Sequence, residues 1–412
     1  MMLSRSQIFR YSALTSRNIC LSTSISSNCG LNNSILSKTK PSTDAKNNFF
    51  AVVTKEKSAS SRTSLVRTSF SLIQQQTRKM ATSSSSNKPY VPSVDKSGAF
   101  VRPDSKHRFR IGSADFPVES KRYMVYIALA CPWASRVTAV IDIMGLEDEI
   151  EVVSVDAEMQ RTKPDDENDH HVGWVFSKEK KGRYIRPDPI FNARTLREVY
   201  EKCGDFEGKF TTPVLFDRKT KRIVNNESSE IIRMLNMEFS ALARHPFDLY
   251  PVSLRATIDE INAWVYENIN NGVYRAGFAQ TQEAYDKAVN ALFEHLDKAE
   301  AILSKMRYLC SDKRITEADI RLFETLVRFD HVYHTHFKCN KKRICDYPNL
   351  FNYTKEIYQL VPNTVDIHEI KQHYYTSHRG INPYKIVAIG PDFEYDKPHD
   401  RDKKFPFDSA SS

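Results

Sequence analysis

Short apolar runs and helically spaced apolar residues alternate in the chain from residue 121 onward. The run KRYMVYIALA (121–130) is rich in β-branched and aromatic residues, which predicts a buried strand. It continues into CPWASRVTAVIDIMG (131–145), where Pro132 suits a first helical position and apolar residues recur at helical spacing. The segment EIEVVSV (149–155) predicts a second strand. This part of the chain is therefore expected to begin as strand, turn, helix and strand.

The alternation resumes after residues 156–190, a charged segment without periodicity that is longer than an ordinary connection. The next predicted elements are a helix, two strands and a helix that Asn226 would cap, at 195–204, 212–217, 222–226 and 227–235. The resulting order β-α-β-α-β-β-α is that of a thioredoxin-like domain.

After residue 250 the apolar pattern is helical throughout. Five helices are predicted, at 253–270, 281–306, 316–330, 348–360 and 364–376. A mixed segment followed by helices alone indicates two domains. We expect an α/β thioredoxin-like N-terminal domain followed by an all-α helical C-terminal domain. The expected parts are an extension, the thioredoxin-like domain, a linker, the helical domain and a tail, at 1–90, 91–237, 238–252, 253–391 and 392–412.

The first 90 residues differ in composition from the rest of the chain. They hold 13 Lys and Arg, two acidic residues and 21 serines. A Ser- and Arg-rich segment with few acids cannot build a core and is typical of an organelle transit peptide. Arg5, Arg10 and Arg17 lie among apolar residues, which favours a mitochondrial address over a plastid one. Met80 could instead start a shorter, cytosolic form.

The remaining chain is nearly neutral, although the whole chain has a net charge of +9. Residues 91–412 hold 47 basic and 49 acidic side chains, a net charge of −2. A nucleic-acid-binding surface is therefore not expected. No run approaches 18 apolar residues, which argues against a membrane span. The seven cysteines show no paired framework, as in proteins of a reducing compartment.

Cys131 is the residue that points most directly to chemistry. At the start of the predicted helix, its sulfur would face unpaired backbone N–H groups and the positive end of the helix dipole, which stabilise a thiolate. Three residues later the chain has Ala134, where a dithiol oxidoreductase would have a second cysteine. Cys131 can therefore form a mixed disulfide that this motif cannot resolve. A cysteine that serves only packing would better fit the interior of a strand.

Two further local motifs follow in the predicted thioredoxin-like domain. Thr212-Pro213 opens the third strand, and in such domains this proline is cis and the preceding backbone binds a peptide substrate. Glu227 and Ser228 lie at a helix start, where N–H groups and a hydroxyl can hold a carboxylate. Taken alone, that helix start also fits an ordinary cap.

These motifs together resemble the glutathionyl-hydroquinone reductases, the Xi class of glutathione transferases. The resemblance covers residues 121–391 in order. It is carried by ALACPWASR, FTTPVLFD, IVNNESSEIIRML, NNGVYRAGFAQTQEAY, ITEADIRLFETLVRFD, HFKCN, DYPNL and HYYTSHRGINPYKIVAIGP. Cys-Pro-Trp-Ala, Asn-Gly-Val-Tyr and Ser-His-x-x-Ile-Asn-Pro are specific for the class only in combination.

The resemblance implies roles for individual residues. Cys131 matches the catalytic cysteine, and Thr212, before the expected cis Pro213, matches the residue whose main chain pairs with the cysteinyl part of glutathione. Glu227 and Ser228 match the pair that binds the γ-glutamyl end.

Four aromatic residues complete the implied site. Trp174, in the long insertion, resembles the tryptophan that packs over glutathione. Tyr274, together with Tyr374 or Tyr375, resembles the hydroxyls that hold the quinol. Which of the two adjacent tyrosines faces the substrate stays open at this point.

Two other clusters are given structural interpretations. Thr316-Glu317-Ala318-Asp319 resembles the capping box of transferase helical domains. His331, His334, His336, Cys339 and Cys345 lie within fifteen residues, but their spacing matches no standard zinc template. We therefore expect no metal.

The resemblance implies an enzyme that uses glutathione as a co-substrate to reduce glutathionyl-hydroquinones, with quinone-derived conjugates as substrates and a homodimer as the assembly. The main rival is an omega-like thioltransferase or dehydroascorbate reductase, which shares the cysteine but not the quinol pocket. A non-catalytic binding protein with the transferase fold is a second rival.

Overall fold

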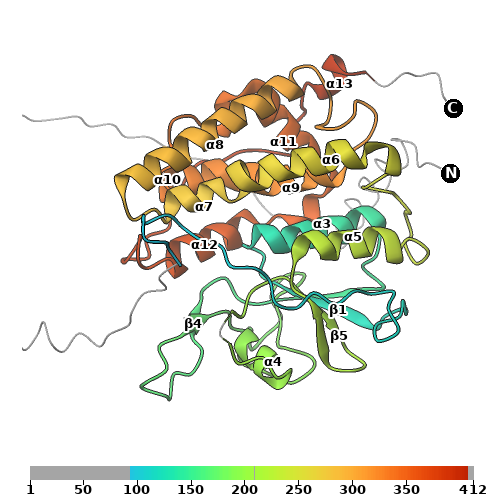
Figure 1. The fold of residues 1–412 in the computed structure, drawn as a ribbon, viewed down its shortest axis with the longest axis vertical. Coiled ribbons are helices and arrows are strands. Elements are labelled where there is room, and N and C mark those ends of the chain that lie inside the picture. The colour runs from blue at the N-terminus through green and yellow to red at the C-terminus, as the bar shows by residue number, and fades with distance from the viewer. Residues whose placement is uncertain (1–92, 208, 407–412) are drawn as a thin grey trace, which may run out of the picture. The chain divides into compact units, whose positions relative to one another are not determined.

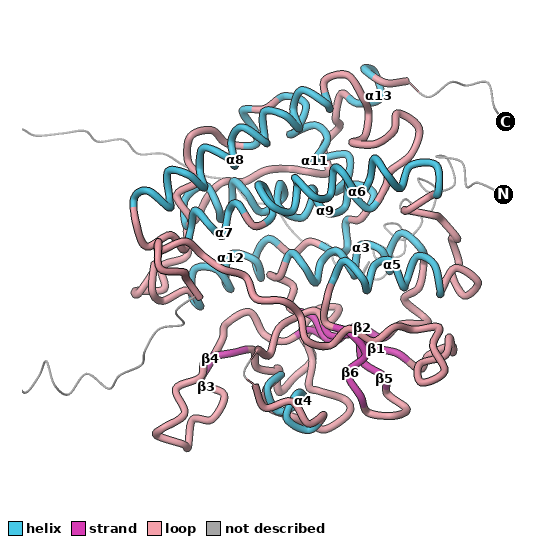
Figure 2. The backbone as a smooth tube through the Cα atoms, in the orientation of Figure 1, coloured by secondary structure: helices cyan, strands magenta, loops and turns pink. Residues whose placement is uncertain are grey.

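The structure is a computed structural model that describes residues 93–207 and 209–406, all within one compact unit. The predicted transit peptide, residues 1–90, therefore lies outside the described residues. Four strands form a mixed sheet in the order β2-β1-β5-β6 (Figure 2). The central strand β1 (Tyr123–Ile127) pairs in parallel with β2 (Glu151–Ser154) and antiparallel with β5 (Val214–Asp217). The edge strand β6 (Arg222–Asn225) pairs antiparallel with β5.

Helices cover both faces of this sheet. The helices α3 (Pro132–Met144) and α5 (Ser228–Glu238) lie on the face toward the helical domain, and α4 (Leu196–Lys202) lies on the other (Figure 1). Alternate side chains of β1 enter two different cores, because successive residues of a strand point to opposite faces. Val125 belongs to the core with α3 and α5, whereas Tyr126 belongs to the core with α4. The expected thioredoxin-like element order is confirmed.

Two details of this domain differ from the sequence prediction. The cap of α5 is Glu227 and not Asn226: the Glu227 carboxylate accepts from the Ser229 N–H at 3.1 Å. The Asn226 side chain is already used, because its amide oxygen accepts from the His107 N–H at 3.1 Å. The long insertion is also not featureless, since it holds a two-stranded ribbon of β3 (Gln160–Arg161) and β4 (Val172–Gly173).

After α5 the regular elements of the described chain are all helices, joined by loops. All five predicted regions contain helices, but the first is interrupted, because α6 runs into a π-helical turn, η2. Short elements that the periodicity did not indicate are α7, α10 and α13, since three to six residues show no helical repeat. In chain order the elements are η1 (Val252–Leu254), α6 (Arg255–Trp264), η2 (Val265–Asn270), α7 (Gly272–Gly277), α8 (Gln282–Leu303), α9 (Glu317–Arg328), η3 (Phe329–Tyr333), α10 (His334–His336), η4 (Ile344–Asp346), α11 (Pro348–Leu360), η5 (Pro362–Thr364), α12 (Ile367–Ser377) and α13 (Arg401–Lys404).

The expected capping box at the start of α9 is present. The buried Asp319 carboxylate accepts from the N–H groups of Thr316 and Leu309, both at 2.8 Å, and from the Tyr353 hydroxyl at 2.9 Å. It thereby fixes the central helix of the helical domain, which packs against α3. Among the described residues, no helix is long and apolar enough to cross a lipid bilayer.

An arm that is mostly without helix or strand precedes β1. Phe109 donates its N–H to the Val224 carbonyl at 3.0 Å, so the arm runs along the free edge of β6. Farther toward the N-terminus the arm reaches the helical domain, where Arg102 Nε donates to Asn271 Oδ1 at 2.8 Å. The arm therefore contacts both domains.

Candidate active site

Cys131 lies between β1 and α3, at the place where the two cores meet. It is the N-cap of α3, with φ −76° and ψ 115°, and Pro132 occupies the first turn. Its half-buried side chain packs against both hydrophobic cores. The first-turn N–H groups of a helix have no partner within the helix, so the sulfur lies at a terminus that favours negative charge. This is the placement that the sequence predicted.

A main-chain carbonyl faces this sulfur. The Thr212–Pro213 peptide bond is cis, as expected, and the Cys131 thiol donates to the Thr212 carbonyl oxygen at 3.5 Å. Thr212 lies two residues before the start of β5 and is itself buried. The thiol thus lies beside the backbone that the resemblance assigns to pairing with a peptide-like ligand.

Glu227 and Ser228 lie where the helix α5 begins. The two Glu227 carboxylate oxygens accept from the hydroxyls of Ser229 at 2.8 Å and of Ser105 at 3.1 Å. Ser228 occupies the first helical position and is buried. The structure therefore gives Glu227 a capping role, and Ser105 of the arm is a partner that local sequence did not indicate.

Three tyrosine hydroxyls form a chain on the helical-domain side of the site. The Tyr274 and Tyr374 hydroxyl oxygens are 2.6 Å apart, and the Tyr374 and Tyr333 oxygens are 3.0 Å apart. Tyr375 points elsewhere, because its hydroxyl donates to the His331 carbonyl at 3.2 Å. Of the two adjacent tyrosines that the sequence left open, the structure thus brings Tyr374 to Tyr274. Tyr333 had not been singled out.

The chain of hydroxyls is protonated at neutral pH. Burial raises the pKa of Tyr274, and the nearby Cys131 raises it further, whereas the Arg102 guanidinium opposes the rise. Burial also holds the pKa of Tyr374 and of Tyr333 well above the usual value. These side chains therefore present hydroxyl donors close to the cysteine.

Arg102 is the cation that sequence analysis missed on this side. Its guanidinium carbon lies 4.8 Å from the centre of the Trp133 ring and 4.9 Å from that of Tyr274. Trp133 follows the Cys-Pro pair directly, so a side chain of the arm joins the cysteine turn to the tyrosines. No local signal revealed Arg102, because the partner of its hydrogen bond is 169 residues away.

Trp174 follows β4 and is 8% exposed. Its ring stacks on His373, with centroids 4.5 Å apart and planes inclined by 27°. It belongs to the core against which Cys131 packs. Trp174 therefore lies where the insertion meets α12, within the same apolar cluster that borders the cysteine.

Two histidines of the His/Cys cluster have separate partners. His331 Nε2 lies 3.2 Å from the Tyr395 hydroxyl, and His336 Nε2 lies 3.2 Å from His378 Nδ1. Cys339 is fully buried, which raises the pKa of its thiol. Across residues 93–207 and 209–406, no three His, Cys, Asp or Glu side chains are placed to hold a metal ion.

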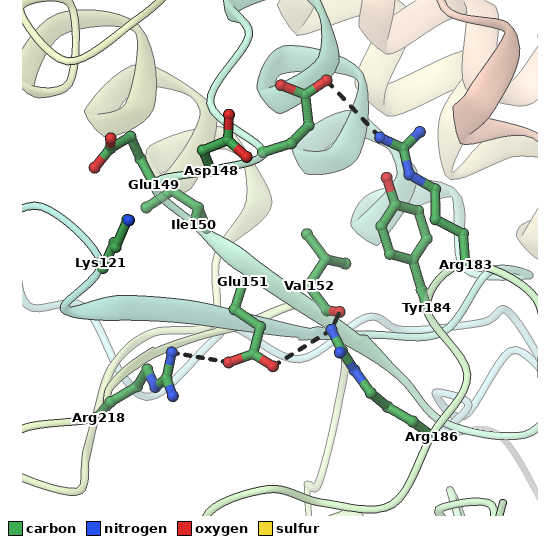
Figure 3. A pocket seen from close by; sticks show the side chains of 11 residues that line it. Lys121, Asp148, Glu149, Ile150, Glu151, Val152, Arg183, Tyr184, Arg186 and Arg218 are labelled. Carbon is green, nitrogen blue, oxygen red and sulfur yellow. Dashed lines mark hydrogen bonds and ion pairs between the residues drawn. The ribbon is translucent and has the colours of Figure 1, made fainter. Parts of the chain in front are cut away.

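An open hollow of about 340 Å³ lies at the β2 edge and contains none of the predicted site residues. Its centre is occupied by the Glu151 carboxylate, which reaches Arg218 at 2.8 Å and Arg186 at 3.4 Å (Figure 3). These acids and bases neutralise one another. The hollow is therefore a salt-bridged surface feature and not the site of the cysteine chemistry.

Comparisons with known proteins agree with this fold. The N-terminal domain model of glutathione S-transferases matches residues 130–238, and the C-terminal domain model matches residues 282–356. The glutathionyl-hydroquinone reductase YqjG of Escherichia coli is 46% identical over 297 residues, which cover 71% of this chain and 87% of that protein.

Solved structures of glutathione transferases also resemble this chain. The Xi glutathione-S-transferase of Phanerochaete chrysosporium is 45% identical with a TM-score of 0.68, covering 74% of this chain and 96% of that one. The glutathione-bound structure of YqjG from Escherichia coli is 44% identical with a TM-score of 0.67, covering 73% and 97%.

The fold and the two matched domains thus define a glutathione transferase. More narrowly, the chain belongs to the Xi class, the family of the glutathionyl-hydroquinone reductases.

Proposed function

We propose that this protein reduces glutathionyl-hydroquinones to hydroquinones, with glutathione as the co-substrate and Cys131 as the nucleophile. The observation that carries the proposal is the 3.5 Å contact between the Cys131 thiol and the Thr212 carbonyl at the start of α3. A glutathione whose cysteinyl main chain pairs with Thr212 places its sulfur beside Cys131. Its γ-glutamyl end then extends toward Glu227 and Ser228 at the start of α5, where N–H groups favour a carboxylate.

The proposed reaction has two steps, cleavage of the carbon–sulfur bond and then a thiol–disulfide exchange. The Cys131 thiolate attacks the glutathionyl sulfur, so an S–S bond forms while the bond between sulfur and the aromatic carbon breaks. The electron pair of the broken bond stays on that carbon, which takes up a proton, and the hydroquinone leaves. A second glutathione then attacks the mixed disulfide, forming oxidised glutathione and restoring the Cys131 thiolate. Ala134 fits this scheme, because the resolving thiol comes from outside the protein.

The aromatic part of the substrate needs a flat apolar slot with hydroxyl partners. We expect this part of the substrate to lie against the rings of Trp133 and Tyr274, which both contact the Arg102 guanidinium. The Tyr274 and Tyr374 hydroxyls supply hydrogen-bond donors for the quinol oxygens. A thioltransferase that accepts any mixed disulfide has no need of this pair, which favours the quinol reductase over the omega-like rival.

The test is mass spectrometry of the protein after mixing with a glutathionyl-hydroquinone and no free glutathione. The expected result is one added glutathione on Cys131 and release of one hydroquinone. Cys131→Ser should give neither, whereas Cys203→Ser, which removes a half-buried thiol on α4's C-terminal side, should behave as the parent protein. Hydroquinone release by Cys131→Ser at the parent rate would refute the mechanism.

We also propose a homodimer and a mitochondrial destination. Tyr384, Ile386 and Ile389 expose 84%, 70% and 91% of their surface, an apolar strip that a second copy would cover. Light scattering on the parent protein and on a variant with Ile386→Ser and Ile389→Ser tests the dimer; a monomeric parent would contradict it.

The Ser- and Arg-rich residues 1–90 support the proposed mitochondrial import. A fusion of this segment to a fluorescent protein tests the import by its location in cells.

A further inference from the structure

Arg328, the last residue of α9, reaches across from the helical domain to the turn that carries Cys131. Its side chain is 0% exposed. Nε donates to the Ala130 carbonyl at 3.1 Å, and Nη2 donates to the Leu129 carbonyl at 3.2 Å. These are the two carbonyls directly before Cys131, so the guanidinium holds the backbone that leads into the nucleophile.

The same guanidinium also holds the chain on the other side of Cys131. Nη2 donates to the Ser135 hydroxyl oxygen at 2.6 Å, and that hydroxyl donates to the Cys131 carbonyl at 3.2 Å. Arg328 therefore touches the cysteine turn before and after the reactive residue. The contact is independent of the local helix start, because its two ends are about 200 residues apart in the chain.

The remaining donors of Arg328 are fixed by its own helix. Nη1 donates to the Glu324 carboxylate at 2.7 Å and to the Glu324 carbonyl at 2.9 Å. All five N–H groups of the guanidinium thus have an acceptor, which is the full capacity of an arginine. A planar fork with five fixed donors orients what it binds more strictly than an ammonium group does. Glu324 thus orients the Arg328 guanidinium, and the guanidinium in turn holds the backbone around Cys131.

Arg328 lies close to the tyrosine chain as well. Its charge favours the ionised form of Tyr374 and of Tyr333, opposing the effect of their burial on the pKa. One buried cation therefore adjoins both halves of the site, the cysteine turn and the hydroxyls that would hold the quinol. A salt bridge that served stability alone would not need to contact three points around the nucleophile.

We propose that Arg328 is a positioning residue that fixes the Cys131 turn relative to the helical domain and its tyrosine chain. Ser135 is the second member of this arrangement, since it passes the contact on to Cys131. The proposal rests on the proposed function for its effect on quinol reduction, but its effect on the cysteine itself does not depend on the substrate.

The test compares Arg328→Lys and Ser135→Ala with a matched control, Arg307→Lys. Arg307 is equally buried and binds Glu356 through Nη2, but it lies in the helical domain away from the cysteine turn. For each variant, three quantities are measured: the thermal unfolding midpoint, kcat and KM for a glutathionyl-hydroquinone, and the second-order rate at which iodoacetamide alkylates Cys131.

Arg328→Lys is expected to lower kcat by about 100-fold, because a displacement near 1 Å of a reacting group costs that much, while KM changes little. It should slow alkylation of Cys131 by about 10-fold, since the sulfur is no longer held at the helix terminus. Ser135→Ala should show the same pattern in smaller measure with a nearly unchanged midpoint. Arg307→Lys should lower the midpoint but leave both rates per folded molecule within about twofold.

Equal loss of activity in Arg307→Lys and Arg328→Lys would overturn the proposal, as would unchanged alkylation and kcat in Arg328→Lys. If Arg328→Lys does not fold, Ser135→Ala decides alone, and parent-like alkylation and kcat in that variant would refute the positioning role. A parent protein that does not reduce the glutathionyl-hydroquinone would refute the proposed function only, because the alkylation rates still test Arg328.

Discussion

Replacing Tyr274 by Phe separates a quinol reductase from a general thioltransferase. The change removes one hydroxyl and keeps the ring, which lies 5.5 Å from that of Phe337 and 6.2 Å from that of Phe278. It leaves Cys131 and the Thr212 backbone untouched. If the hydroxyl binds the quinol, only the reaction with an aromatic substrate should suffer.

Tyr274→Phe should have only a small effect on stability, because of the geometry of the hydroxyl chain. The Tyr374 hydroxyl loses its 2.6 Å partner but keeps Tyr333 at 3.0 Å, so no buried hydroxyl is left unpaired. The loss of one neutral hydrogen bond costs about 1 kcal/mol of unfolding free energy. For a chain of this size that lowers the unfolding midpoint by about 1–2 °C. The fraction of folded protein at 25 °C stays close to one.

The effect on quinol reduction is much larger. Negative charge that develops on the aromatic part as the carbon–sulfur bond breaks is stabilised by a fixed donor, and removal of one such donor costs about 100-fold in kcat. We expect that loss with a glutathionyl-hydroquinone. With a small mixed disulfide of glutathione, kcat should stay within about twofold, since no aromatic leaving group is present.

Tyr375→Phe is the matched control in the same assays. Its hydroxyl donates to the His331 carbonyl and not to the Tyr274–Tyr374 pair, so both activities should persist. Equal losses of quinol and disulfide reduction in Tyr274→Phe would refute the role of the hydroxyl and favour the omega-like rival. Loss of quinol reduction in Tyr375→Phe with none in Tyr274→Phe would show that the wrong tyrosine had been assigned.

Two further predictions concern stability. Asp319→Ala should lower the unfolding free energy by about 3 kcal/mol in urea titrations, because it leaves several buried donors unpaired. The control Asp346→Ala removes a similar but exposed cap beside Arg343 and should cost under about 1 kcal/mol. Equal losses of unfolding free energy in the two variants would contradict this account. Burial lowers the pKa of His373 to about 4, so the folded protein disfavours the charged ring. Its contribution should be complete above about pH 6.5 and fall by up to about 3 kcal/mol as the pH drops toward 4. Parallel urea titrations at pH 7 and 4.5 should show a smaller fall for His373→Gln, and an identical fall would exclude this histidine.

Features set by a few neighbouring residues were predictable from the sequence. The strand, turn and helix around Cys131 and the cis proline at Pro213 follow from local apolar spacing and from a short motif. The cap of α5 was misassigned to Asn226, because two adjacent polar residues fit the position equally well. Only the arm decides between them, since the His107 main chain occupies Asn226.

The contacts that join the two domains were not predictable in this way. Tyr274 and Tyr374 are 100 residues apart, and the choice between Tyr374 and Tyr375 depends on how α12 is rotated against α7. Arg328 reads locally as an ordinary basic residue near a helix C-terminus, where a cation is favoured anyway. Its contacts with Leu129 and Ala130 come from the packing of α9 on α3, which no periodicity specifies.

The position of Arg102 between Trp133 and Tyr274 limits how the N-terminus can be processed. Asp95 and Gly98 form a turn before Arg102, and Gln280 donates its N–H to the Gly98 carbonyl at 3.0 Å, so the arm is attached to the helical domain from there on. A protease that removed the arm beyond this turn would take away Arg102, the side chain that contacts both Trp133 and Tyr274. If import occurs as proposed, a cleavage that spares the Asp95–Gly98 turn also spares Arg102, and so does translation from Met80. The proposed imported form and a form that starts at Met80 would therefore contain the same candidate site residues, because all of these residues lie after Met80.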